Sequence, residues 1–418
     1  MKYLLLGAGK MGKAIAYDLI YVQKAEKLIL ANRHIEKAEK LKKWLCSIEG
    51  SESVTGNDIK NNTEKIEIVE ADVDDSEKLV QLMSGVDCVI CAVAYQYNYL
   101  AATAAIKAGV PYCDLGQNVD IVDKEFTLTE QAEAKNITMI PDGGVAPGMV
   151  NIVAAHAIKN FTSVDQVLMR VGGLPRYPKP PLNYAVTWSV HGLINEYIEK
   201  ARILRNGEFL EVDSLSELET ITFHYPFNKM EAFITSGGSS TLPRTYQGKI
   251  NELNYKTIRY PNHYHIMRAF LDLGFTNQEP VKVNGKAISP RLFLEKLLKE
   301  KLRKDHVDDV ILLRVTVTGK KLANKIGTTN KDKNKGENSG TNEIQAKETY
   351  EMIDYYDPET GLTAMMRCTG FSLAIVAGMI AEKKIKRHGV LTQEESIPTD
   401  LYLSELEKRG IKFLCKKD

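Results

Sequence analysis

Two adjoining stretches decide the fold: the apolar run Lys2-Tyr3-Leu4-Leu5-Leu6 and the glycine-rich run Gly7-Ala8-Gly9-Lys10-Met11-Gly12. The first run has no helical period and predicts a short buried strand. Residues 13–21 then carry apolar side chains at helical spacing, and residues 27–31 form a second apolar run. A GxGxxG pattern that follows a strand and opens a helix in this order indicates a dinucleotide-binding βαβ unit.

Each glycine of this turn has its own part in such a unit. Gly7 permits the tight turn, Gly9 lets the backbone approach a pyrophosphate, and Gly12 lets the helix pack closely on the strand. The free N–H groups at the start of the helix, at Lys10 and Met11, then meet the phosphate charge. We therefore predict that the turn binds the phosphates of a dinucleotide. The alternative is a glycine turn that closes an ordinary βαβ unit.

The end of the second strand bears on the choice between NAD and NADP. Sites that prefer NAD usually place Asp or Glu there, where the carboxylate bonds the ribose hydroxyls. This chain has Asn32 followed by Arg33. A neutral Asn does not repel a 2′-phosphate, and the planar guanidinium of Arg33 can bind phosphate through two hydrogen bonds. We predict an NAD(P) site that modestly favours NADP; the alternative is a solvated, basic helix start.

Further apolar runs alternate with helical patterns up to residue 140, at residues 66–69, 87–93, 112–115 and 137–140. This alternation predicts an α/β fold with a doubly wound parallel sheet of the Rossmann type. Ligands of such sheets bind beyond the carboxyl ends of the strands. The candidates there are Asp72, Ala92 and Val93 for the cofactor, Tyr95 and Gln96 for a substrate, and Asp114 and Asp142 for catalysis.

The pattern changes after Asp142-Gly143-Gly144. Alternating strands and helices up to residue 361 predict a second, α+β domain, which is a common place for a dimer interface. Residues 319–345 are rich in Lys, Asn, Gly and Thr, and predict a mobile, solvated hairpin tip. Residues 363–383 predict one long apolar helix with small residues on one face, which we expect to pack on the nucleotide domain.

The composition is that of an ordinary globular protein of 418 residues: 44% are hydrophobic, 26% are charged, and the net charge is +1. We therefore expect no nucleic-acid partner. No apolar run approaches the roughly 20 residues of a membrane span, and we expect a cytoplasmic protein without membrane contact.

Cys88 and Cys91 form a CxxC motif on a predicted strand, where their side chains point to opposite faces. His263 and His265 have chelating spacing on a strand but no evident third ligand, so we predict no metal.

Several motifs together resemble the saccharopine dehydrogenase superfamily and, within it, the L-lysine 6-dehydrogenases. They are Tyr95-Gln96-Tyr97-Asn98, Asp114-Leu115-Gly116, the run Pro141 to Met149, and further short matches that extend to Arg409-Gly410. The resemblance implies a Rossmann domain built from both chain ends (residues 1–125 and 362–418) and a substrate-binding and dimerisation domain (residues 126–361) in a homodimer. It also implies oxidative deamination of the ε-amine of L-lysine to 2-aminoadipate 6-semialdehyde. Asn32 departs from the Asp of the NAD-linked enzymes.

Such a reaction makes defined demands on side chains. A base must deprotonate the ammonium and later activate water, and Asp114 and Asp142 are the candidates. The substrate carboxylate needs Arg or Lys. The candidates in the second domain are Arg244, Lys256 and Arg259. His191, which opens a predicted helix, is a further candidate of the substrate site that could act as a base; the alternative is a surface or hydrogen-bonded structural histidine. Because Lys256 and Arg259 lie three apart on a strand, we expect only one of them to reach the pocket.

Two alternative functions stay open on the sequence alone. One is a saccharopine dehydrogenase, which handles a secondary amine with three carboxylates and so needs more cations. The other is a catalytically inactive dinucleotide-binding sensor or assembly protein, because a fold does not fix a function. The intact glycine turn and the two carboxylates favour an enzyme.

Overall fold

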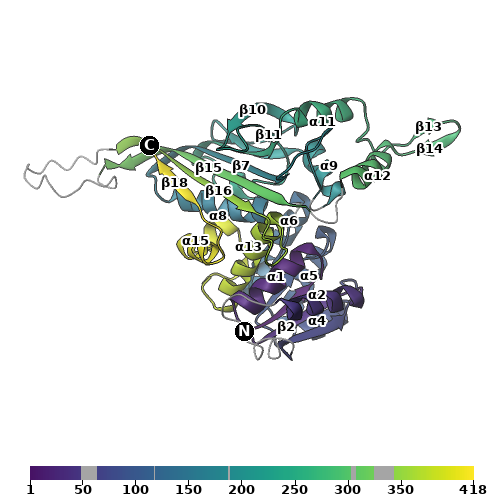
Figure 1. The fold of residues 1–418 in the computed structure, drawn as a ribbon. Helices are drawn as coiled ribbons and strands as arrows, with labels where there is room; N and C mark the ends of the chain where they lie inside the picture. The colour runs from purple at the N-terminus through teal and green to yellow at the C-terminus, as the bar shows by residue number, and fades with distance from the viewer. Residues whose placement is uncertain (49–63, 117, 187–188, 303–306, 324–342) are drawn as a thin grey trace, which may run out of the picture.

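The computed structural model describes residues 1–48, 64–116, 118–186, 189–302, 307–323 and 343–418. The chain forms two lobes (Figure 1), one around each of two large sheets. The first lobe contains the amino terminus. In the second, long strands are stacked beside helices, and a two-stranded hairpin projects from its far end.

The first sheet is parallel and has the order β17-β6-β5-β4-β1-β2-β3. Its strands are β1 Lys2–Leu6, β2 Lys27–Asn32, β3 Ile66–Glu70, β4 Cys88–Cys91, β5 Tyr112–Asp114, β6 Thr138–Ile140 and β17 Gly389–Val390. Strand order 3-2-1-4-5-6 is that of a dinucleotide-binding Rossmann sheet. The prediction of a doubly wound parallel sheet is therefore confirmed, and the seventh strand comes from the carboxyl-terminal part of the chain.

Helices cover both faces of this sheet. They are α1 Lys10–Tyr17, α2 Ile35–Ser47, α4 Ser76–Met83, α5 Asn98–Ala108, α6 Val119–Phe126 and α7 Thr129–Ala134, with single turns at Asp18–Val22 and Tyr95–Tyr97. Cys88 belongs to the apolar cluster with α1 and α2, whereas Cys91 belongs to the cluster with α4 and α5. The two cysteines thus face opposite sides of the sheet, as strand geometry requires.

The second sheet has nine strands, and its main path runs β10-β11-β12-β7-β15-β16-β18. The strands are β7 Ser163–Pro175, β8 Ala201–Arg205, β9 Glu208–Val212, β10 Ser216–Thr222, β11 Lys229–Ile234, β12 Ile250–Arg259, β15 Asp309–Leu322, β16 Glu343–Tyr355 and β18 Leu414–Lys417. The associated helices are α8 Val150–Ile158, α9 Val190–Ile198, α10 Leu242–Thr245, α11 His263–Asp272 and α12 Pro290–Leu302. A separate hairpin joins β13 Val281–Val283 to β14 Lys286–Ile288.

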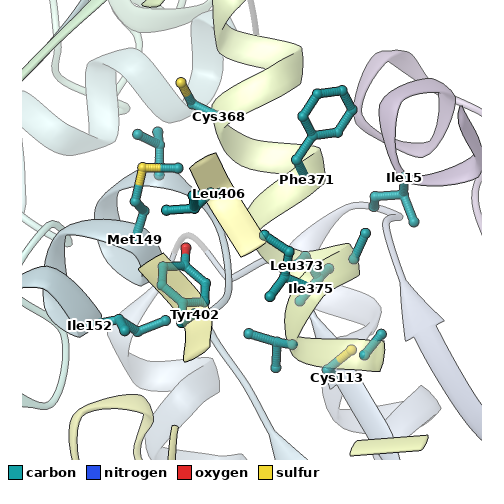
Figure 2. Close-up of a cluster of buried hydrophobic side chains, with 14 of the residues drawn as sticks. Ile15, Cys113, Met149, Ile152, Cys368, Phe371, Leu373, Ile375, Tyr402 and Leu406 are labelled. Carbon is teal, nitrogen blue, oxygen red and sulfur yellow. The ribbon is translucent and has the colours of Figure 1, made fainter. Parts of the chain in front are cut away.

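Helix α13, Ala364–Ala381, lies at the centre of the largest core cluster. Figure 2 shows its Cys368, Phe371, Leu373 and Ile375 among side chains from both lobes, including those of α8 and of α15, Thr399–Lys408. A methyl group at Gly370 would lie 2.6 Å from the Cβ of Ala14 on α1, so a glycine here permits close packing of the two helices. The expected return of this helix to the nucleotide domain is confirmed.

The same helix passes a test of length and hydropathy for a membrane span. Its 18 residues have a mean hydropathy of 1.6, but 83% of that stretch is buried inside the protein. Burial of this extent is what a core helix shows.

The chain ends are joined across the first lobe. Arg409, just after α15, forms a buried ion pair with Asp18, in which its Nη2 lies 3.0 Å from Oδ1 of Asp18. Helix α14, Gln393–Ser396, follows the terminal strand β17 of the first sheet. The first lobe is therefore built from the amino-terminal part of the chain together with later segments that include β17 and Arg409.

Three predicted boundaries change. Strand β6 pairs with β5, so residues 126–140 belong with the first sheet and not with the second domain. Strand β18 pairs with β16, so the last residues return to the second sheet. Residues 319–322 and 343–345, which were predicted to belong to the tip, instead pair as parts of β15 and β16. Residues 324–342 lie outside the described part.

Candidate active site

A cavity of about 220 Å³ lies where the two lobes meet. From the first lobe, the carboxyl ends of the strands contribute Met11, Ala92, Val93, Tyr95, Leu115, Gly116 and the run Gly143 to Pro147. From the second, α9 and β12 contribute Asn195, Glu196, Tyr255, Thr257 and Arg259, and Tyr184 and Ser236 to Gly238 also line the cavity. The cavity thus joins the expected nucleotide edge of the first sheet to polar groups of the second.

The three glycines of the amino-terminal turn differ in what surrounds them. Gly7 has a φ of +105°, and a Cβ there would lie 2.6 Å from the carbonyl oxygen of Ala92. A Cβ at Gly12 would collide with the carbonyl oxygen of Gly7. Gly9 has no heavy atom within 4 Å of its Cβ position. Two glycines therefore serve packing, whereas Gly9 faces open space.

The start of α1 is suited to bind a negative charge. Its N-cap, Gly9, offers no side-chain hydrogen bond, and the first turn contains no acidic residue. The exposed Lys10 begins the helix. Since the N-terminal N–H groups of a helix bind anions, this cradle fits the pyrophosphate of a dinucleotide.

Asn32 and Arg33 have different environments at the end of β2. The Asn32 side chain accepts a hydrogen bond from the backbone N–H of Ala8 at 3.1 Å and donates to the carbonyl oxygen of His34 at 2.8 Å. It therefore holds the glycine turn in place. The side chain of Arg33 is 59% exposed, and its Nη1 lies 3.9 Å from Oδ2 of Asp72. Arg33 is free to turn toward a ligand phosphate.

Arg259 is the only Lys or Arg among the described residues that line the cavity. Its side chain is 4% exposed, and its Nη2 lies 3.7 Å from Oε2 of Glu196. Its Nε donates to the hydroxyl of Tyr197 at 2.9 Å, and its guanidinium stacks on the ring of Tyr184. These contacts fix the position of a buried positive charge.

Glu196 is the only Asp or Glu among the described lining residues. Its side chain is 27% exposed. Burial raises the pKa of Glu196 to about 7, although the nearby charge of Arg259 opposes this rise. The cavity therefore presents one cation and one group that ionises near neutral pH, side by side.

The catalytic candidates Asp114 and Asp142 lie behind the cavity wall. Asp114 is fully buried, and Asp142 is 5% exposed. A methyl group at Gly116 would collide with Oδ1 of Asp142, so that carboxyl lies directly against Gly116, which lines the cavity. Burial raises the pKa of Asp114 to about 6 and that of Asp142 to about 7. In this structure neither carboxyl reaches the cavity, and their role in proton transfer stays a prediction.

Four of the predicted substrate residues lie elsewhere. Gln96 is exposed on the surface turn, and His191 is 52% exposed with its Nδ1 2.9 Å from Oε1 of Glu295. Arg244 forms a two-fold ion pair with Asp123, and Nζ of Lys256 lies 2.9 Å from Oε2 of Glu219. Of the predicted substrate residues, only Tyr95 and Arg259 line the cavity.

The opposite orientation of Lys256 and Arg259 agrees with strand geometry. The same rule identifies residues that the sequence analysis missed, because Tyr255 and Thr257 share the face of Arg259 at intervals of two. Glu196 was missed as well. It lies on the predicted helix after His191, and only the tertiary contact with β12 distinguishes it from other helical glutamates.

His263 and His265 lie on helix α11 rather than on a strand. His263 is buried with its Nε2 3.0 Å from the Tyr197 hydroxyl, and burial lowers its pKa to about 3. The ring is therefore neutral and supports the Tyr197–Arg259 contact. Within the described ranges, no group of three His, Cys, Asp or Glu side chains is placed to hold a metal ion.

Two family models of known proteins together match nearly the whole chain. The family model described as "Saccharopine dehydrogenase NADP binding domain" matches residues 3–140, and the one described as "Saccharopine dehydrogenase C-terminal domain" matches residues 144–411. The carboxynorspermidine synthase of Vibrio cholerae is 25% identical over 333 residues, which are 72% of this chain and 73% of that protein.

Two saccharopine dehydrogenases are also similar. The NADP-linked, L-glutamate-forming enzyme of Schizosaccharomyces pombe is 23% identical over 66% of this chain, which spans only 58% of that longer protein. The structure of the enzyme from Saccharomyces cerevisiae has a TM-score of 0.75 at 18% identity, covering 100% of this chain and 99% of that chain. This second likeness shows the shared fold.

Proposed function

We propose that this chain, which belongs to the saccharopine dehydrogenase family, oxidises the ε-amine of L-lysine to 2-aminoadipate 6-semialdehyde. At the coarser level, it is an NAD(P)-dependent oxidoreductase that acts on a CH–NH or CH–NH₂ group. A nicotinamide cofactor, when bound, would supply the acceptor for the hydride that leaves the carbon next to the amine. The choice of lysine rests on the charges that line the cavity.

The single pair of opposite charges in the described cavity wall supports a small amino acid as substrate. The α-carboxylate and α-ammonium of lysine are neighbours, as are Arg259 and Glu196 at 3.7 Å. Arg259 would bind the carboxylate, because a guanidinium matches its two oxygens, and Glu196 would bind the ammonium. The side chain of lysine then extends its ε-amine toward Gly116 and the nucleotide lobe.

The pKa of Glu196 sets the expected pH dependence of this step. Because Glu196 ionises at a pH of about 7, we expect kcat/KM for lysine to rise as the pH passes upward through this value. Glu196→Gln should raise KM by about tenfold or more, as for loss of a charge-assisted contact, and should flatten that rise. Steady-state kinetics across pH measure both effects; an unchanged profile in the variant would assign the ionisation to another group.

A secondary amine is the second candidate substrate. The similar proteins are named for saccharopine and carboxynorspermidine, and this naming favours it. Saccharopine, however, carries three carboxylates, whereas the described lining offers the single cation Arg259. A compound with one carboxylate fits this lining better.

One assay distinguishes the candidates. Cofactor reduction is followed with L-lysine, saccharopine and cadaverine, each with NAD and with NADP. We expect the highest kcat/KM with L-lysine. A higher value with saccharopine would overturn the lysine assignment, and binding of cofactor without turnover of any amine would favour a sensor.

We also propose that the site prefers NADP. Arg33 is exposed, and among the described residues its ion pair is the 3.9 Å contact with Asp72. A charge-assisted bond is worth about 1.5–3 kcal/mol before screening by salt. Arg33→Ala should therefore raise KM for NADP by about tenfold and leave KM for NAD nearly unchanged. Arg387→Ala, which removes another arginine, is the control. Equal Michaelis constants before and after the change would show that Arg33 points to solvent.

A homodimer is proposed for the assembled protein. The hairpin of β13 and β14 projects from the second lobe beside α12 (Figure 1). The hairpin and α12 expose apolar side chains, among them Val281 at 50%, Leu292 at 67% and Phe293 at 51%. Exposed apolar groups that lie together are typical of association surfaces, and light scattering after size-exclusion chromatography measures the mass.

A further inference from the structure

Behind the cavity wall, three buried carboxyl groups lie within electrostatic reach of one another: Asp114 at the end of β5, Glu125 on α6 and Asp142 after β6. Glu125 is 1% exposed. Burying three ionised carboxylates together would be very costly, because each loses its hydration and repels the others. At least one of them must therefore remain protonated at neutral pH.

The side chains of Asp114 and Glu125 lie within hydrogen-bonding reach of each other, and the hydrogen bonds around them indicate which of the two holds the proton. Oδ1 of Asp114 accepts from Nδ2 of Asn98 at 2.9 Å and from the backbone N–H of Asp142 at 3.1 Å. If every carboxyl is treated as ionised, Oδ2 of Asp114 and both oxygens of Glu125 are buried without a partner. Two N–H donors favour the charged form of Asp114. A proton on Glu125 supplies the missing donor to Asp114.

We propose that Glu125 is a positioning residue whose carboxyl proton is hydrogen-bonded to Oδ2 of Asp114 and fixes the two strand-end loops of the cavity wall. Asp114 is the link between these loops. Its side chain binds the N–H of Asp142, and its carbonyl oxygen accepts from the N–H of Gly143 at 2.7 Å. Leu115 and Gly116 on one loop, and Gly143 and Gly144 on the other, line the cavity.

The charges around Glu125 agree with this assignment. Burial raises its pKa to about 12, and the charges of Asp114 and Asp142 act in the same direction. Among the described residues, the other titratable groups that interact with it are Cys91 on β4 and Tyr112 on β5, whose own pKa values are raised by burial. Both are neutral at physiological pH, so the environment of Glu125 supplies negative charge from the two aspartates.

A spectroscopic test uses no substrate and so does not depend on the proposed lysine activity. Infrared difference spectra of wild type minus Glu125→Gln, recorded at a pH of about 8, should contain the C=O band of a protonated carboxyl group. Glu130→Gln is the matched control, because Glu130 is exposed on the neighbouring helix α7. Absence of a protonated-carboxyl band from the Glu125 difference spectrum would overturn the proposal.

The pH dependence of stability provides a second test. When folding raises the pKa of a carboxyl group, its contribution to stability is fully present at a pH below the pKa of the unfolded state. That contribution is lost as the pH rises toward the pKa of the folded state. The Tm of Glu125→Gln relative to wild type should therefore increase steadily between about pH 5 and about pH 9. The Tm difference of Glu130→Gln should stay constant. A constant difference for Glu125→Gln would mean that no proton is retained there.

Measurements of kcat distinguish a hydrogen-bonding role of Glu125 from a role in packing alone. The amide of Glu125→Gln can still donate to Asp114, so we expect its kcat within about twofold of wild type, whereas Glu125→Ala should lose about tenfold, equivalent to one buried hydrogen bond. Equal losses in the two folded variants would contradict the proposed donor. If no tested amine is oxidised, the proposed function fails, and the infrared and Tm results still decide the place of the proton.

Discussion

Gly9→Val is expected to abolish dinucleotide binding while the folded structure and its Tm stay close to those of wild type. The backbone at Gly9 is extended, with a φ of −80°, a value that any residue adopts. Its Cβ position has no heavy atom within 4 Å. A valine therefore meets no protein atom at its Cβ and instead occupies the space through which a pyrophosphate would approach the start of α1.

The size of the effect follows from loss of close approach to the phosphates. Exclusion of the pyrophosphate should weaken binding by about hundredfold or more, which is about 2.7 kcal/mol. Isothermal calorimetry with NADP and NAD measures it, and circular dichroism establishes the fold. Gly12→Ala is the contrasting control, because its Cβ collides with the carbonyl oxygen of Gly7 and should lower the Tm. Undiminished affinity in folded Gly9→Val would show that the turn has only a structural part.

The nucleotide lobe could be predicted because its signals are local. The run from Lys2 to Gly12 contains strand, turn and helix start within a few residues, and the period of the following apolar runs gives the order of the elements. The strand β17 could not be found in this way. It has only two residues, and it forms because the edge of β6 is available for pairing. The two segments are far apart in sequence: the hydrogen bond between Thr138 and Arg387 beside them spans 249 residues.

The candidate substrate residues show why a charge in the sequence does not identify a ligand-binding group. Arg244 and Arg259 are both cations of the second lobe, but Arg244 is neutralised by Asp123, 121 residues away. Arg259 instead lies against the rings of Tyr184 and Tyr197 with one carboxylate at 3.7 Å. Which partner a cation finds depends on tertiary contacts, and no spacing along the chain encodes it.

The buried carboxyl groups of Asp114 and Asp142 also show what the sequence could not predict. Their positions at strand ends were predictable, since these ends form the ligand edge of the sheet. That Gly116 lines the cavity while the Asp142 carboxyl lies against it, outside the lining, depends on how single atoms of the two loops pack. Sequence reasoning therefore located the edge of the sheet but not the side of the wall on which each carboxyl lies.

Arg259→Leu is expected to lower kcat/KM for L-lysine by about hundredfold or more, because truncating one partner of a buried, charge-assisted contact costs about 2–5 kcal/mol. The substitution also leaves Glu196 without its cation. Since Arg259 lowers the pKa of Glu196, that pKa should rise further above about 7 in the variant. The double variant Arg259→Leu with Glu196→Gln also removes the carboxyl group that would be left without its cation, so it serves as a second test if the single variant does not fold.

Cadaverine provides the matched substrate control, because it is lysine without the α-carboxylate. If Arg259 binds that carboxylate, wild type should use cadaverine poorly, and Arg259→Leu should reduce its kcat/KM by much less than that of lysine. Arg259→Lys should give an intermediate loss with lysine, since an ammonium keeps the charge but not the two-pronged geometry. Steady-state kinetics with both substrates measure the difference. An equal loss with lysine and cadaverine would place Arg259 in the support of the cavity wall and not at the substrate carboxylate.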